Sequence, residues 1–342
     1  MNLHEFVQRM PKVELHVHLE GSILPRTLLL LSQRNRIELP YKTIEELQEL
    51  YRFRDFNHFI ENYWIITGCL CTPEDYQLIA YEFGRECARQ NIRYAEATFS
   101  ISTNMAKTGL PWQTILQALN EGRAQARDEF GVQWQWVFDI VRNLPETQEE
   151  LTRIALDAQP MGVVALGLGG GEAEFPAELF TASFDRAVKA GLHSVPHAGE
   201  IAGPSSVWTA VKQLHADRIG HGVRSIEDPQ LVEFLSDEQI PLEVCPTSNI
   251  ALCVFPDYAQ HPLRKLWDAG ILLTVNSDDP PMFNTSLNQE YQVLIDHFGF
   301  GLPELEKVSL NALKASFLSD GEKERMTREF KTEFSHLKNE SS

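Results

Sequence analysis

The chain alternates two kinds of hydrophobic pattern. Short runs rich in valine, isoleucine and phenylalanine are followed by longer segments with apolar residues at helical spacing and abundant Glu, Gln, Arg and Ala. This alternation favours repeated strand–helix units and a parallel sheet. Eight strands are predicted, at Val13–Val17, Ile92–Phe99, Gln133–Val141, Val163–Leu168, Ser194–His197, Arg218–Gly222, Pro241–Val244 and Leu272–Asn276.

Helical segments separate these strands. Several begin with proline in or near the first turn, where its missing N–H costs no hydrogen bond. Eight strands with seven intervening helices and a helical tail predict a TIM (β/α)8 barrel, with an open doubly wound sheet as the alternative. The seven helices are expected at Pro73–Gln90, Pro111–Phe130, Thr147–Gln159, Pro176–Ala190, Ser205–His215, Pro229–Ser236 and Pro262–Ala269.

The segment between the first two strands is longer than a barrel requires. It runs from about Ile23 to Gln90 and holds several helical stretches, one of which carries Phe56, Phe59 and Ile60 at helical spacing. We expect extra helices here that cover the barrel mouth as a lid, although an ordinary core stripe gives the same pattern. The expected domain is a single barrel over residues 1–336, with a short polar tail over residues 337–342.

Composition narrows the range of partners and locations. The 342 residues include 30 Lys and Arg against 48 Asp and Glu, for a formal net charge of −18. Nucleic-acid binding normally needs a basic face, and an acidic lipid surface would repel this chain. There is no apolar run of membrane-spanning length and no secretory signal, and the five scattered cysteines do not form a disulfide framework. We therefore expect a cytoplasmic protein with a small-molecule substrate; nothing indicates an oligomeric state.

Two histidines lie on the first predicted strand. His16 and His18 are two residues apart, which places both imidazoles on the same face of a strand, here the barrel interior. Paired imidazoles of this kind are typical zinc ligands. A hydrogen-bonded pair of packed histidines is the alternative.

Polar residues also follow the fifth and sixth strands. His197 can supply a third nitrogen ligand, and Glu200 lies three residues further on. A carboxyl group kept protonated by burial can act as a general acid. His221 stands between two glycines on the sixth strand and could orient or deprotonate a metal-bound water. An incidental loop and a core histidine are the respective alternatives.

The eighth strand ends in two acidic residues. Asp278 can supply an oxygen ligand, and Asp279 can bind substrate, although Asp-Asp-Pro-Pro is also good turn sequence. The glycine run that includes Gly170, after the fourth strand, matches neither a dinucleotide fingerprint nor a P-loop. It favours a backbone that approaches a flat ring, or else a flexible loop. Because the carboxyl ends of barrel strands carry the active site, these groups are expected to share one rim.

Six stretches together resemble the adenosine deaminase family over nearly the whole chain. They are Pro11–Gly21, Met161–Val164, His197–Glu200, Arg218–Gly222, Glu243–Pro246 and Asn276–Pro280. The resemblance implies a zinc ion held by His16, His18, His197 and Asp278, with His18 also near the substrate. It further implies that Glu200 protonates purine N1, that His221 orients and helps deprotonate the water, that Asp279 meets N7 and the Gly170 N–H meets N3, and that Ser248 lies just outside the ligands.

The resemblance implies hydrolytic deamination of a 6-aminopurine nucleoside by metal-bound hydroxide. One zinc per chain is expected, because the fourth strand lacks the lysine that bridges two metals in binuclear relatives; iron, cobalt and manganese are alternatives. Glu20 departs from the aspartate of adenosine-specific members, at the position that meets the ribose 5′-hydroxyl. Free adenine and aminodeoxyfutalosine are therefore alternative substrates. A pyrimidine or pterin deaminase, and a non-catalytic binding protein on the same fold, are the remaining hypotheses.

Overall fold

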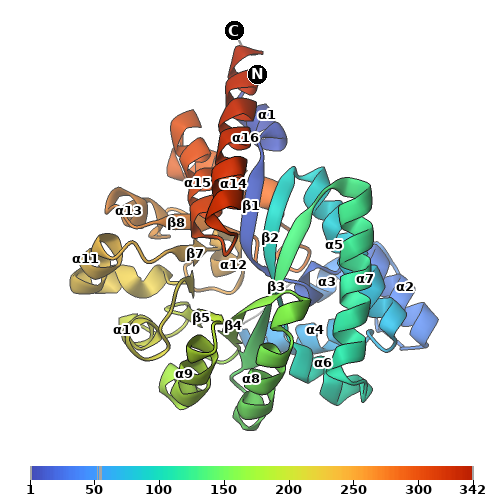
Figure 1. Cartoon of the computed structure of the whole chain (residues 1–342). Coiled ribbons are helices and arrows are strands. Elements are labelled where there is room, and N and C mark those ends of the chain that lie inside the picture. The colour runs from blue at the N-terminus through green and yellow to red at the C-terminus, as the bar shows by residue number, and fades with distance from the viewer. Residues whose placement is uncertain (1, 52, 54–55, 341–342) are drawn as a thin grey trace.

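Eight parallel strands form a nearly closed barrel, surrounded by helices, in a computed structural model that describes residues 2–51, 53 and 56–340 (Figure 1). The strands are hydrogen-bonded in chain order from β1 to β8. The predicted TIM barrel is therefore confirmed, and each predicted strand overlaps an observed one. The strands are β1 Lys12–His18, β2 Ile92–Phe99, β3 Gln133–Val141, β4 Val163–Gly169, β5 His193–Ala198, β6 Ile219–His221, β7 Leu242–Val244 and β8 Leu273–Val275.

The helices lie outside the barrel and after its last strand. They are α1 Leu3–Arg9, α2 Pro25–Asn35, α3 Ile44–Leu50, α4 Phe56–Thr67, α5 Pro73–Arg89, α6 Ile101–Thr108, α7 Trp112–Phe130, α8 Gln148–Asp157, α9 Thr181–Lys189, α10 Pro204–Gln213, α11 Pro229–Asp237, α12 Pro246–Ala251, α13 Leu263–Asp268, α14 Leu287–Phe298, α15 Leu302–Ala315 and α16 Asp320–Asn339. No helix in the described ranges is long and apolar enough to cross a membrane.

Most predicted elements differ from the observed ones by one or two residues at their ends, and two differ in kind. The segment expected to be helical from Pro176 begins as a 3-10 helix, Ala177–Phe180, and becomes α-helical only at Thr181. At the other end of the chain, α16 continues to Asn339 and buries Leu337, so the helix extends into the segment expected to be a polar tail. The buried Leu337 side chain and the ion pair of Lys338 with Glu306 (2.8 Å) hold this last helical turn against the rest of the protein.

The barrel closes between β8 and β1 partly through side chains. The Asn276 amide oxygen accepts hydrogen bonds from the backbone N–H groups of Leu15 (2.9 Å) and His16 (3.2 Å). Beyond the end of β8, the backbone of Asp278 accepts from the His18 N–H (2.9 Å) and donates to the His16 carbonyl (3.1 Å). The seam therefore fixes the first and last strands against each other at the rim where the candidate site lies.

The barrel interior contains an ion network below the rim. Arg218, at the start of β6, is 1% exposed and donates to Glu243 on β7 (2.5 Å), to Glu96 on β2 (2.6 Å) and to the Ala315 carbonyl (2.9 Å). Its guanidinium also lies 3.9 Å from the centre of the Phe317 ring. One buried cation thus compensates two buried carboxylates on opposite sides of the barrel.

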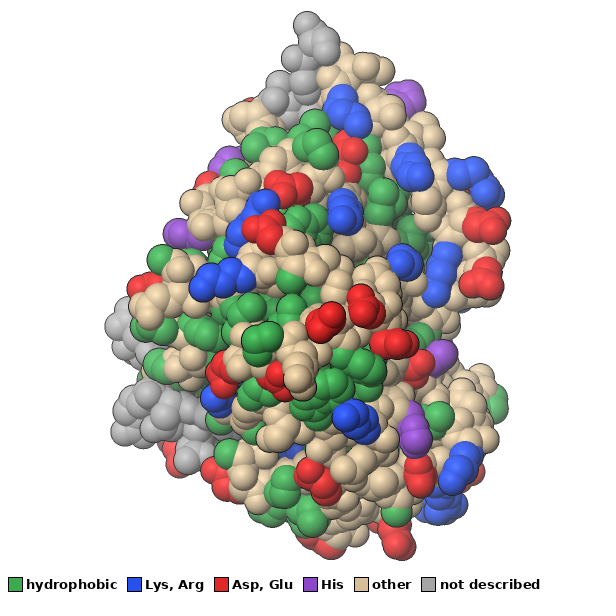
Figure 2. Space-filling model, turned by 90° about the vertical axis from the view of Figure 1, so that its left-hand side faces the viewer, with side chains coloured by type: hydrophobic (Ala, Val, Ile, Leu, Met, Phe, Trp, Pro, Cys, Tyr) green, Lys and Arg blue, Asp and Glu red, His purple; other side chains and the backbone are tan. Residues whose placement is uncertain are grey.

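The side of the barrel that carries α10, α11 and α13 presents acidic and basic side chains that are interspersed (Figure 2). Several of these charges are paired within a helix, as Arg264 is with Asp268 on α13 at 3.0 Å. Exposed pairs of this kind contribute little to the free energy of unfolding.

We expect Arg218→Met to lower the free energy of unfolding by about 3–5 kcal/mol, because it leaves two carboxylates buried without their cation. Urea denaturation followed by circular dichroism measures the change. Arg325→Met is the matched control, since Arg325 pairs with Glu329 at the surface. Equal stability of the two variants would contradict this account of the barrel interior.

Candidate active site

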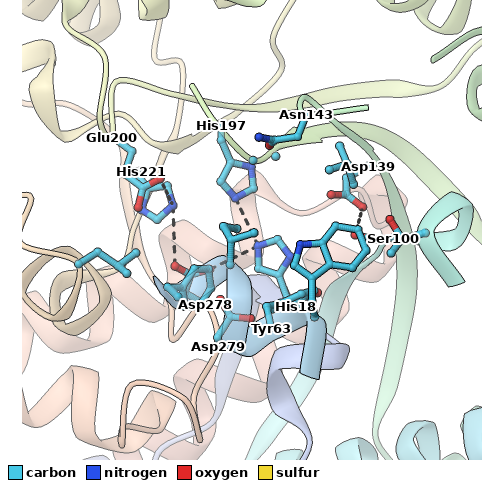
Figure 3. A pocket seen from close by; sticks show the side chains of 18 residues that line it. His18, Tyr63, Ser100, Asp139, Asn143, His197, Glu200, His221, Asp278 and Asp279 are labelled. Carbon is cyan, nitrogen blue, oxygen red and sulfur yellow. Dashed lines mark hydrogen bonds and ion pairs between the residues drawn. The ribbon is translucent and has the colours of Figure 1, made fainter. Parts of the chain in front are cut away.

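A cavity opens at the carboxyl ends of the strands, where the predicted polar residues converge (Figure 3). It contains about 890 Å³ of space free of protein atoms, a volume that includes the part open to solvent. Its lining combines aromatic and aliphatic side chains with titratable ones: His18, Phe59, Ile60, Tyr63, Trp64, Ser100, Thr103, Asp139, Val141, Asn143, Gly169, Gly170, His197, Glu200, His221, Leu252, Asp278 and Asp279.

The four residues predicted to bind metal lie together at the bottom of this cavity. The Nε2 atoms of His18 and His197 are 3.3 Å apart. Asp278 Oδ1 lies 3.3 Å from His18 Nε2 and 3.5 Å from His16 Nε2. Ligand atoms of His16, His197, His221 and Asp278 also lie within 4.8 Å of one another.

The chemistry of this cluster suits a cation. His16 Nδ1 faces Glu243 Oε2 at 2.9 Å, so its proton belongs on that side, and Nε2 presents a lone pair. Nε2 is buried and has no hydrogen-bond partner. A buried lone pair that faces a carboxylate is costly unless a proton or a metal ion lies between them. Three imidazoles and one carboxylate are the donor set that zinc prefers.

The ligand candidates are held from behind by other side chains. Glu243 accepts from both His16 and Arg218, so the ion network in the barrel ends on a predicted ligand. The Ser248 hydroxyl donates to Asp278 Oδ2 at 2.7 Å, so Ser248 lies just outside the cluster. Partners of this kind fix the orientation of metal-binding side chains.

Two local features allow such close packing of side chains. A Cβ atom at Gly220 would lie only 2.8 Å from His16 Cε1. The residue of β6 that passes the His16 imidazole must therefore lack a side chain. Asp278 adopts a left-handed backbone conformation with φ of 63°. Because strand geometry has ended before Asp278, its side chain and that of Asp279 point to different parts of the site.

Glu200 lies at the edge of the cluster. Its Oε2 atom is 3.7 Å from His221 Nε2, and its side chain is buried. Burial raises the pKa of Glu200 well above its ordinary value, and the nearby carboxylates of Asp278 and Glu172 raise it further. A carboxyl group in this environment holds a proton at neutral pH and can donate it.

The loop that carries Glu200 is anchored by Glu172, a residue to which the sequence pattern assigned no role. The Glu172 carboxylate accepts from the backbone N–H groups of Gly199 (2.6 Å), Ile201 (2.8 Å) and Ala202 (2.8 Å), and from the Ser206 hydroxyl (2.5 Å). Its place directly after a glycine run was the only sequence signal. Glu172 therefore acts on the site by fixing the backbone on either side of Glu200.

Arg142 was also missed by the sequence analysis. It is fully buried and donates to the His197 carbonyl (2.8 Å) and to the Phe175 carbonyl (2.6 Å). It thereby ties the end of β5 to the loop after β4. The position of Arg142 after the third strand did not indicate these hydrogen bonds, because both partners are backbone carbonyls from other segments of the chain.

Asp279 is buried beside the cluster, and its Oδ1 atom has no hydrogen-bond partner. Burial, followed by the adjacent Asp278, raises the pKa of Asp279 well above its ordinary value. The carboxyl packs directly over Gly21, where any Cβ atom would collide with it. Asp279 and Gly170 both line the cavity, as expected of groups that meet a substrate.

Glu20 lies behind the cavity wall rather than in its lining. Its Oε1 atom accepts from the Ser100 N–H (3.1 Å) and from the Asn104 amide (2.9 Å), while Oε2 has no hydrogen-bond partner. Burial, followed by the proximity of Asp139, raises the pKa of Glu20 to about 8. Glu20 therefore does not line the cavity in which its contact with substrate was expected, and that contact stays a prediction.

The predicted lid falls on α4, within the α2–α5 segment that joins β1 to β2. Phe59 and Ile60 line the cavity, together with Tyr63 and Trp64 of the same helix. The side chain of Phe56, the third predicted lid residue, lies outside the described part of the structure. Sequence reasoning did not identify Ser100, Asp139 and Asn143, which form a polar wall opposite Glu200 (Figure 3).

A parallel barrel with histidines and a carboxylate converging at its carboxyl-terminal mouth defines the class of metal-dependent hydrolases. The adenosine deaminase family model matches residues 11–333. The chain therefore belongs to the adenosine deaminase family, and it is an aminohydrolase.

Individual relatives extend along almost the whole chain. An aminodeoxyfutalosine deaminase from Streptomyces avermitilis is 43% identical, with 97% of this chain and 93% of that protein covered. An adenine deaminase from Geotalea uraniireducens is 36% identical, with 98% of this chain and 95% of that protein covered. The solved structure of an adenine deaminase from Arthrobacter aurescens superposes with a TM-score of 0.90 at 32% identity, covering 94% of this chain and 98% of that one. The structure of an amidohydrolase from Burkholderia ambifaria, solved with bound zinc, gives a TM-score of 0.90 at 26% identity. The match covers 99% of this chain and 95% of that one.

We expect Glu243→Gln to weaken metal binding about 10- to 100-fold, because His16 loses the carboxylate that orients it and makes it more basic. Competition with a chromophoric chelator measures the dissociation constant. Glu290→Gln is the matched control, since Glu290 is a buried carboxyl that accepts from the Thr247 N–H and touches no predicted ligand. Equal metal affinities in the two variants would show that Glu243 does not support the cluster.

Proposed function

We propose that this protein catalyses the hydrolytic deamination of a 6-aminopurine nucleoside with one zinc ion per chain. The observation that carries the proposal is the juxtaposition of the buried histidine–aspartate cluster with Glu200, a carboxyl group that burial keeps protonated. Zinc bound to His16, His18, His197 and Asp278 would supply hydroxide near neutral pH. The zinc-bound Burkholderia structure and the nitrogen-rich donor set support this choice of metal.

The protein's own groups then have distinct tasks. An aromatic amine resists attack at C6 because addition breaks the conjugation of the ring, and protonation of N1 makes the ring electrophilic. Glu200 is placed to give N1 that proton, since it is protonated and faces the cavity beside the cluster. The proton and the hydroxide together allow ammonia to leave and the 6-oxopurine to form.

The opposite side of the ring would meet groups from β8 and β4. Asp279 carries a buried oxygen that lacks a partner, and a protonated carboxyl there can donate to N7. Gly170 lines the cavity with φ of 95°, a conformation in which a bare backbone can approach a flat ring. The expected contact of its N–H with N3 agrees with this position.

A nucleoside is favoured over a free base by the polar wall across the cavity. The Ser100 hydroxyl donates to Asp139 Oδ1 at 2.8 Å, and Asp139 lines the cavity. Burial raises the pKa of Asp139 to about 6, so the carboxylate is largely ionised at neutral pH and accepts hydrogen bonds. A base bound against Glu200 and Asp279 would add no donor to Asp139 beyond the Ser100 hydroxyl, whereas a ribose hydroxyl could donate to the same carboxylate.

Aminodeoxyfutalosine is the first nucleoside to test, because the Streptomyces relatives that act on it cover nearly the whole chain. The aromatic side chains of Phe59, Tyr63 and Trp64 offer an apolar surface for a substituent on the sugar. Free adenine is the second candidate, supported by adenine deaminase relatives at 34–36% identity.

We expect Glu200→Gln to lower kcat about 10²- to 10⁴-fold with little change in zinc content, because the amide cannot transfer a proton to the ring. Ultraviolet-monitored deamination and metal analysis of the purified protein give the two readouts. Glu290→Gln should retain turnover. Near-normal kcat in Glu200→Gln would remove this residue from the role of acid.

We expect Asp139→Asn to lower kcat/KM for nucleosides about 10- to 100-fold, the effect of losing a hydrogen bond to a charged acceptor. The panel is aminodeoxyfutalosine, adenosine, 2′-deoxyadenosine and adenine, assayed side by side with zinc-loaded protein. Adenine is the internal control and should change much less. An equal loss for all four substrates would show that Asp139 does not face the sugar, and turnover of adenine alone by the unmodified protein would reject the nucleoside proposal.

A further inference from the structure

A chain of three side chains leads away from the cluster behind His221. His221 Nδ1 lies 3.2 Å from the Asn249 side-chain nitrogen, on α12. The Asn249 amide oxygen lies 3.0 Å from His261 Nε2. The other ring nitrogen of His261, Nδ1, accepts from the backbone N–H of Leu263 at 3.2 Å. All three side chains are buried.

The direction of every hydrogen bond in this chain follows from its far end. A backbone N–H can only donate, so His261 Nδ1 must be unprotonated. A neutral imidazole then carries its proton on Nε2, which donates to the Asn249 oxygen. The Asn249 nitrogen is left facing His221 Nδ1, and since an amide nitrogen can only donate, that Nδ1 must accept.

The reversed arrangement is excluded by the same rule. If the Asn249 amide were turned around, its nitrogen would face His261 Nε2, and the proton of His261 would move to Nδ1. That proton would point at the Leu263 N–H, donor against donor. Protonation of both His261 nitrogens is opposed by its surroundings, because burial between Phe255 and Phe298 lowers the pKa of His261 to about 3.

We infer that Asn249 and His261 fix His221 as the neutral tautomer with its proton on Nε2, so that His221 enters the site as a hydrogen-bond donor. Nε2 is the atom that faces the site, 3.7 Å from Glu200 Oε2 and 3.8 Å from Asp278 Oδ2. The inference rests on the proposed function only in that the acceptor belongs to the reacting groups. Asn249 and His261 are positioning residues that act through His221.

Two consequences follow for the site. A ring nitrogen that carries a proton cannot coordinate a metal ion, so His221 is not a ligand even though it lies among the clustered groups. The imidazole ligands are therefore His16, His18 and His197. His221 also begins the reaction as a donor that orients and stabilises oxygen, and not as the base that the family resemblance suggested.

The inference is tested directly by the ring nitrogens. Two-bond proton–nitrogen correlation spectra of the full-length, zinc-loaded protein with labelled histidine distinguish the two neutral tautomers, and His221→Gln and His261→Gln spectra assign the signals. We expect the Nε2–H form at both positions. An Nδ1–H form at His221 would overturn the inference.

Asn249→Asp reverses the last hydrogen bond with almost no change in volume. The carboxylate still accepts from His261 Nε2 but cannot donate, so His221 should change to the Nδ1–H tautomer, and kcat should fall about 100-fold with a smaller change in KM. Asn288→Asp is the matched control, because Asn288 is a buried asparagine bonded to Gln8, far from the site in the fold. An unchanged His221 tautomer in Asn249→Asp would contradict the inference.

A second pair of variants separates positioning from packing. The side chain in His261→Gln can still accept from the Leu263 N–H and donate to Asn249, whereas the side chain in His261→Phe fills the space but can do neither. We expect His261→Gln to retain most of the turnover and His261→Phe to lose it; equal turnover in the two would count against the inference.

The tautomer is read without substrate, so the two proposals can fail separately. The expected tautomer with no purine turnover supports the inference and rejects the proposed function. An Nδ1–H form of His221 in a protein that deaminates purines rejects the inference and supports the proposed function.

Discussion

The mouth of this barrel buries many more carboxyl groups than cationic side chains, and the rest of the site is arranged around that imbalance. Lys12, Arg142 and Arg218 are the fully buried cationic residues among those described, whereas buried aspartates and glutamates lie within or after most of the strands. Each such carboxyl must be protonated, hydrogen-bonded or paired with a cation. The structure uses each of these solutions at a different place.

The three solutions separate the chemical roles. Glu243 and Glu96 are paired with Arg218 and serve as support, and Glu172 is satisfied by backbone N–H groups and holds a loop. Glu200 and Asp279 receive neither kind of partner, and burial leaves them protonated. Asp278 is surrounded by imidazoles whose lone pairs converge on it, an arrangement that a divalent cation completes. Environment therefore gives the carboxyl groups of aspartate and glutamate different properties: some are protonated, some support other groups, and Asp278 faces the imidazoles of the proposed metal site.

The same site depends on closure of the barrel between its first and last strands. Asp278 contributes its backbone to the β1–β8 seam and its side chain to the cluster, so that the proposed ligand is held by the fold itself. His221 is held in a comparable way, through Asn249 and His261, by a single backbone N–H at Leu263. Rigid support of this kind limits the reorganisation that catalysis requires.

The sequence by itself determined the barrel, the order of its strands and the identity of the clustered groups. Alternating hydrophobic periods set the elements, and polar residues at strand ends marked His16, His18, His197 and Asp278, because a strand end lies at the same rim in every unit of a barrel. Only the tertiary structure decided the supporting contacts of Glu172 and Arg142, the place of Asp139 in the cavity lining, the position of Glu20 behind that lining, and the direction of the hydrogen bonds at His221. Those properties depend on burial and on partners from distant segments, and residue spacing along one strand carries no information about either.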